Sequence, residues 1–183
     1  MLATGRVLGT EVGSTAPIFL AILAVHVPAG LVAVLSGAGA ALSRKGSARH
    51  VRFGRYYCVA IGVVFVTASA LAGLRWREDW YLFLLGALAF AAAVLGYLHR
   101  RRHRAGDTAH ILGMGGSYAV MLAAFYVDNG PHLPLWDRLP HLAFWLLPGA
   151  IAAPLILRAV RRARSDHRPT PGPAPDATAA RVR

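Results

Sequence analysis

Five apolar stretches limit what this chain can fold into. Each has about 20 residues without a single Asp, Glu, Lys or Arg, and they lie at residues 16–42, 56–74, 80–98, 108–127 and 141–157. About 20 apolar residues in an α-helix cross the ~30 Å hydrocarbon core of a bilayer, whereas a helix of a soluble protein alternates apolar and polar faces. The sequence therefore predicts an all-α fold: a polytopic membrane protein with a bundle of five transmembrane helices.

The regions outside the bundle differ from it in composition. Residues 1–14 form a short N-terminal lead, residues 15–164 form the transmembrane domain, and residues 165–183 are rich in Pro, Ala and Arg. Such a tail cannot bury enough apolar surface to offset the entropy of ordering, so we expect it to be disordered. The net charge of +12 resides mainly in loops and tail. We therefore expect the lipid bilayer as the partner of the chain, and no nucleic acid.

The distribution of basic residues predicts the orientation. Four lie in the N-terminal lead and in the second and fourth loops, against fourteen in the first loop, the third loop and the start of the tail: Arg44, Lys45, Arg49, Arg52, Arg55, Arg100, Arg101, Arg102, Arg104, Arg158, Arg161, Arg162, Arg164 and Arg168. Loops rich in Lys and Arg stay in the cytoplasm. The N-terminus is thus predicted outside and the C-terminus inside, in a multi-pass protein of the cytoplasmic membrane.

Small residues on two of the stretches predict how the helices pack. Gly30 and Gly37 lie at helical spacing on the first stretch, and Gly113 and Gly116 on the fourth. Small residues allow close backbone approach, which drives helix association where lipid removes the hydrophobic effect. We therefore expect the first and fourth helices to form a central antiparallel pair.

His26 is the first candidate for a functional group. It lies about ten residues into the first stretch, near mid-membrane, where ionisable residues are costly and often functional. Tyr118 and Met121 on the fourth stretch lie at matching depth. A hydrogen bond from His26 to Tyr118, or to another neighbouring helix, is one interpretation, and axial ligation of haem iron by His26 and Met121 is another.

A second group of candidates precedes the second and fourth stretches. His50, Arg55 and Tyr57 lie at the start of the second, and His110 at the start of the fourth. Imidazole and guanidinium groups at the cytoplasmic face could bind an anionic headgroup, a phosphate or a quinone carbonyl. The alternative is that these are ordinary cytoplasmic-side residues whose side chains extend to the headgroups.

These segments resemble a family of small bacterial integral membrane proteins, the domain of unknown function 2306. Its pattern has a histidine in the first span, then His-Arg-x-x-Gly-Arg-x-Tyr, then His-Arg-x-Trp-Met-x-Arg-Ser-Tyr. His26 matches the first element. The second is matched at His50, Gly54, Arg55 and Tyr57, with Val51 where Arg is usual, and the third loosely at His110, Met114, Ser117 and Tyr118. The resemblance covers residues 20–125 and implies no established activity.

Three functions are compatible with this sequence. The first is a small binding or accessory protein with a histidine-containing polar site in the membrane for haem, quinone or lipid. The second is a transporter of protons or small molecules that uses His26, and the third is a non-catalytic subunit of a larger membrane complex or a homo-oligomer. We assign no catalytic residue, because no nucleophile, base and orienting group can be placed together by spacing.

Overall fold

The computed structural model describes residues 5–7, 10–12, 17–102, 108–134, 136 and 138–165. The helices are α1 (Pro17–Leu42), α2 (Ala48–Leu74), α3 (Trp76–Arg102), α4 (Thr108–Asn129), a 3-10 turn η1 (Gly130–His132) and α5 (His141–Ser165). The lead contains a hairpin of two antiparallel strands, β1 (Gly5–Val7) and β2 (Thr10–Val12), with Gly5 opposite Val12. The hairpin was not expected from the sequence. The tail after Ser165 lies outside the described residues, so its predicted disorder stays a prediction.

Five helices are long and apolar enough to cross a membrane, which confirms the predicted helical bundle. Large apolar side chains cover the outside of all five, and Leu31, Val59, Leu95 and Leu155 are each at least 59% exposed. On a soluble protein such a surface would aggregate, but in a bilayer it contacts lipid. The chain is therefore a multi-pass membrane protein.

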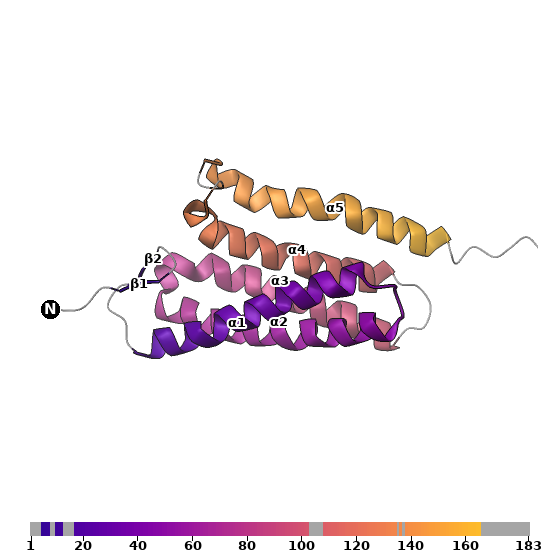
Figure 1. Ribbon diagram of the computed structural model, residues 1–183, viewed down its shortest axis with the longest axis horizontal. Helices are drawn as coiled ribbons and strands as arrows, with labels where there is room; N and C mark the ends of the chain where they lie inside the picture. The colour runs from indigo at the N-terminus through magenta and orange to yellow at the C-terminus, as the bar shows by residue number, and fades with distance from the viewer. Residues whose placement is uncertain are drawn as a thin grey trace, which may run out of the picture.

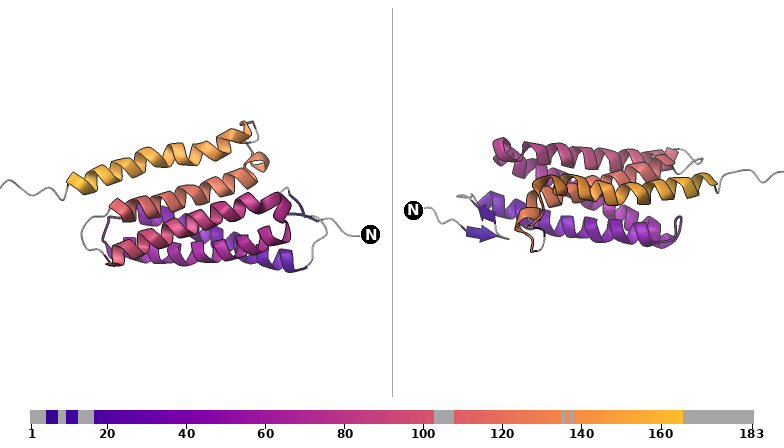
Figure 2. Two further views of the ribbon diagram at one scale, coloured as in Figure 1. Left: turned by 180° about the vertical axis from the view of Figure 1, so that it is seen from behind. Right: turned by 90° about the horizontal axis from the view of Figure 1, so that it is seen from above.

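Consecutive helices run antiparallel and form the main contacts: α1 with α2, α2 with α3, α3 with α4, and α4 with α5. Figures 1 and 2 show α1 to α4 gathered into one bundle, with α5 lying along the side that α4 forms. The loop between α1 and α2 lies at one end of this bundle, where α3 and α5 also end and α2 and α4 begin. We call this the basic end, because its described residues include Arg44, Lys45, Arg49, Arg52, Arg55, Arg100, Arg101, Arg102, Arg158, Arg161, Arg162 and Arg164.

Several helices continue beyond the predicted spans at the basic end. α2 begins at Ala48 instead of residue 56, α3 ends at Arg102 instead of residue 98, and α5 ends at Ser165 instead of residue 157. The predicted limits followed the apolar residues, but a helix does not need to end where the hydrocarbon ends. Arg and Lys side chains extend from such helix ends toward the headgroups and water. His50 consequently lies within a helix and not in a loop.

A close backbone approach joins α3 and α4. A Cβ added to Gly113 would lie 2.6 Å from Gly96 Cα and 2.7 Å from the carbonyl oxygen of Ala92. Gly37 leaves room for aromatic rings, whereas a Cβ on Gly30 or Gly116 would meet no neighbouring atom within 4 Å. α1 packs mainly on α2, and α4 on α3 and α5, so the prediction of a central pair of α1 and α4 was wrong. Gly30 and Gly116 face open space in this chain, and their role in helix packing stays a prediction. The small-residue pattern did not identify Gly96 as the partner of Gly113.

We expect Gly113→Ala to lower the free energy of unfolding by about 1–3 kcal/mol, the usual cost of overpacking, because the new methyl group would press on backbone atoms of α3. Gly116→Ala is the matched control in the same helix. It has open space and gains up to about 1 kcal/mol of helix propensity, so it should be neutral or stabilising. Unfolding of the purified protein in mixed detergent micelles measures both. Equal effects of the two substitutions would contradict the α3–α4 contact.

Candidate functional site

Two histidines that are 60 positions apart in the sequence meet at the basic end. His50 is the third residue of α2 and His110 is the third residue of α4. Their ring centroids are 6.2 Å apart and their planes are inclined by 71°. Both were predicted as ligand candidates, and the fold places them side by side.

The Nδ1 atom of each ring contacts a backbone carbonyl of the preceding helix. His50 Nδ1 lies 3.0 Å from the oxygen of Ala40 on α1, and His110 Nδ1 lies 3.1 Å from the oxygen of Gly96 on α3. A carbonyl oxygen only accepts hydrogen bonds, so Nδ1 must donate and carry the hydrogen. In the neutral ring the lone pair is then on Nε2. Both imidazoles are thus fixed in the same tautomer.

Local backbone structure places His50 in this position. Gly46 has φ of 78°, a left-handed conformation that glycine adopts at little cost, and this residue lets the chain reverse between α1 and α2. Ser47 then caps α2, with its side-chain oxygen accepting a hydrogen bond from the backbone nitrogen of His50 at 3.2 Å. The cap sets the first turn of α2 against the last turn of α1, where the carbonyl of Ala40 lies.

Two turns further along both helices, a cluster of hydroxyl groups ties the bundle together. The hydroxyl groups of Tyr57 and Ser117 are 2.6 Å apart, and both residues are buried. The Tyr118 hydroxyl donates to the carbonyl of Val34 on α1 at 3.1 Å. Gly37 makes room for these rings, because a Cβ there would lie 2.5 Å from Tyr118 and 3.1 Å from Tyr57. Gly37 is therefore a packing residue, as predicted. It accommodates two aromatic side chains, however, and not the backbone of another helix.

The histidine pair and the hydroxyl cluster show that α2 and α4 run parallel and in register. His50 and Tyr57 are seven residues apart, as are His110 and Ser117. Seven residues are close to two helical turns, so each pair lies on one face of its helix. The segments that begin at His50 and His110, which resemble the second and third elements of the family pattern, thus face each other across the bundle.

His26 forms a separate polar contact with Thr67 of α2. Its Nδ1 lies 2.8 Å from the Thr67 hydroxyl oxygen, and this hydroxyl in turn donates to the carbonyl of Val63 at 2.7 Å. The predicted partners do not bond to it: Tyr118 bonds to α1, and Met121 is buried in the apolar core. The predicted partners were residues of α4 that lie at the same depth in the membrane as His26. However, α1 packs mainly on α2, and the partner of His26 lies on that helix.

The remaining predicted residues contribute less to a site. Arg55 is exposed at the basic end, one turn beyond His50. Among the described residues, no group of three or more His, Cys, Asp or Glu is placed to hold a metal ion, and no buried side-chain nitrogen or oxygen lacks a hydrogen-bond partner. Thr67 and the carbonyls of Ala40 and Gly96 could not be found from the sequence, because their contacts depend on which helices are neighbours.

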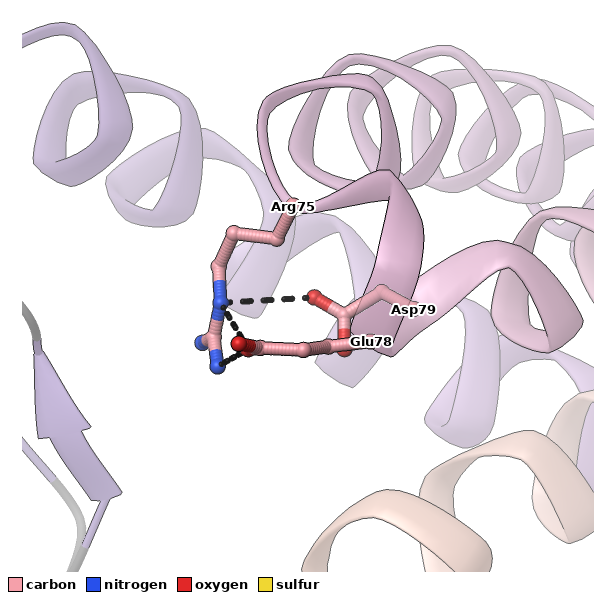
Figure 3. Close-up of polar contacts among 3 residues, drawn as sticks. All are labelled: Arg75, Glu78 and Asp79. Carbon is pink, nitrogen blue, oxygen red and sulfur yellow. Dashed lines mark hydrogen bonds and ion pairs between the residues drawn. The ribbon is translucent and has the colours of Figure 1, made fainter.

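The opposite end of the bundle carries a compact ion-pair cluster (Figure 3). Arg75 lies between α2 and α3, donates to Glu78 from Nε at 2.9 Å and lies 3.8 Å from Asp79. Glu78 and Asp79 are in the first turn of α3, where carboxylates favour the positive end of the helix dipole. The cluster is partly exposed, and such pairs contribute at most about 1 kcal/mol. Its role is to shape the tight turn between two spans.

Comparison with models of protein families, with curated proteins and with solved structures gives no match to this chain.

We expect His26 and Thr67 to be energetically coupled. His26→Leu and Thr67→Val should each destabilise the protein, and a double-mutant cycle should give a coupling of about 0.6 kcal/mol and at most about 1.7 kcal/mol, as found for hydrogen bonds between membrane helices. Unfolding in mixed micelles measures the cycle. Ser69→Ala serves as the control, because the Ser69 hydroxyl donates to Phe65 of its own helix. Coupling of His26 to Ser69 as strong as that to Thr67 would contradict the assignment.

Proposed function

We propose that this chain is a multi-pass protein of the cytoplasmic membrane that binds a hydrophobic ligand or cofactor with a polar head, and that His50 and His110 at the basic end hold that head. The observation that carries the proposal is the meeting of these two rings in one fixed tautomer. The two rings come from helices that are not consecutive in the chain, and each is held by Nδ1 to the helix that precedes it, so the bundle presents them together at its basic end.

The surroundings of the pair support an amphipathic ligand. Arg49, Arg52 and Arg55 are exposed at the start of α2, close to His50 in the chain, so an anionic or strongly polar head would be attracted there. The outer surfaces of α1 to α4 are apolar and offer contact for a hydrophobic body. Haem, a quinone and an anionic lipid all have this combination of parts.

His26 is accounted for by its bond to Thr67, which is why we place the ligand at the basic end and not at mid-membrane. The motif residues of the resemblance to the domain of unknown function 2306 agree with this choice, since the second and third patterns each begin at one of the paired histidines. We retain membership of that family as part of the proposal.

The orientation is part of the same proposal: the basic end faces the cytoplasm, and the N-terminus lies outside. We expect labelling of single cysteines to support it. In a Cys58→Ser background, Arg138→Cys should react with a membrane-impermeant maleimide in intact spheroplasts, and Lys45→Cys only after permeabilisation. Both positions are exposed in loops. The reverse pattern would overturn the orientation and would place the histidine pair outside.

We expect ligand binding to depend on both histidines. Purified protein should be heated with hemin, a menaquinone analogue or phosphatidylglycerol, and its melting temperature followed by tryptophan fluorescence. A ligand that binds the folded state raises the melting temperature as its concentration increases. The double variant His50→Asn with His110→Asn should lose this rise, because Asn can still donate to the carbonyls of Ala40 and Gly96 but lacks an imidazole.

His132→Asn at the opposite end is the matched control and should keep the wild-type response. The proposal fails if none of the three ligands stabilises the wild type, or if the double variant responds as the wild type does.

A further inference from the structure

We propose that α5 binds the headgroup of an anionic phospholipid, in the leaflet that surrounds the basic end of the bundle. The site is an open groove of about 580 Å³ on this helix, which we call the α5 groove. It is lined by Pro154, Leu157, Arg158, Arg161, Arg162 and Ser165. Neither histidine of the pair lines it, so the α5 groove is a second site, separate from the one in the proposed function.

The α5 groove lies on the face of the helix that points away from the bundle. Its lining residues are related by steps of three or four positions, which place them on one side of an α-helix. The other side packs on α4: a Cβ added to Gly115 would lie 2.8 Å from Ile156, and Val160, one turn further, is buried. Figure 1 shows α5 at the edge of the molecule. The groove is therefore open to the lipid around the protein.

The arginines of the groove begin where the apolar part of α5 ends. Residues 141–157 contain no Asp, Glu, Lys or Arg. They extend about 26 Å at 1.5 Å per residue, close to the ~30 Å of a hydrocarbon core. Arg158 is the next residue and lies at the level of the headgroups, and the other two arginines follow one turn further out. Pro154 and Leu157 line the groove on the hydrocarbon side. A phospholipid has the same order of parts, an acyl chain followed by a phosphate.

Charge complementarity identifies the occupant as anionic. Three guanidinium groups line the groove, and no carboxylate among the described residues forms an ion pair with them. A guanidinium group presents its N–H donors in a plane that matches the oxygens of a phosphate. Basic residues next to the membrane surface attract anionic lipids. A zwitterionic lipid also carries a cation, which the arginines would repel, so we expect the groove to select an anionic phospholipid.

Lipid binding by variants of the purified protein tests the site. The protein in a mild detergent should be titrated with phosphatidylglycerol or with phosphatidylcholine of the same acyl chains, and native mass spectrometry should count the bound lipid. We expect phosphatidylglycerol to be retained in preference to phosphatidylcholine. Arg161→Gln should weaken its binding about fivefold, the usual contribution of one basic residue near a membrane surface. A photoreactive phosphatidylglycerol should label α5 of the wild type.

Arg164→Gln is the matched control. Arg164 is an exposed arginine on the same turn of α5 but does not line the groove, and its loss changes the net charge by the same amount. This variant should bind phosphatidylglycerol nearly as the wild type does. All of these arginines are exposed, so each variant should keep the wild-type melting temperature. Equal weakening by the two substitutions would indicate a general attraction of charges and would overturn the α5 groove.

The same series in the double variant His50→Asn with His110→Asn separates the two sites. Phosphatidylglycerol that remains bound there and is lost with Arg161→Gln supports the α5 groove, whatever becomes of the histidine pair. Loss of all phosphatidylglycerol in the double variant alone would overturn the groove and leave the proposed function standing. Equal retention of the two lipids, or photolabelling confined to other helices, would also overturn the groove.

Discussion

Within a bilayer a polar side chain has no water to bond to, so its partner must come from the protein itself. The polar contacts of this bundle follow from that constraint. His26 bonds to Thr67, Tyr57 to Ser117, and Tyr118 to the carbonyl of Val34. Each contact joins two different helices, so the few polar residues decide which helices lie together and at what height. Apolar side chains on the outside have no such preference, since one lipid-facing position is much like another.

The histidine pair at the basic end also joins different helices through polar contacts. His50 is tied to α1 and His110 to α3, while their rings meet between α2 and α4. The pair therefore depends on all four helices from α1 to α4. The remaining helix, α5, packs on α4, and we assign it no part in the pair. The hydroxyl cluster two turns deeper repeats the connection of α2 to α4 and keeps the two rings in register.

The sequence was sufficient for the five helices, because runs of apolar residues without charge leave no other fold. The sequence was less informative about which helices are adjacent in the bundle. Depth along the membrane placed His26 level with Tyr118, but depth does not say which helix is adjacent, and the partner was Thr67. Glycine spacing likewise marked Gly113 correctly as a contact but not its partner Gly96, since any small residue on any helix could have met it. The motif-like segments containing His50 and His110 were identified, while their meeting and their carbonyl partners required the fold.

The dependence of the pair on four helices has a consequence for how the protein is made. A membrane protein enters the bilayer from its N-terminus as the ribosome extends it, at about 5–20 residues per second. When α1 and α2 are inserted, His50 already has its carbonyl on α1, but the ring opposite it has not yet been synthesised. Only after α4 enters does the second imidazole arrive. Anything that requires both rings can therefore be loaded only onto a chain whose first four helices are assembled, so occupancy of the basic end would report that α1 to α4 have been inserted.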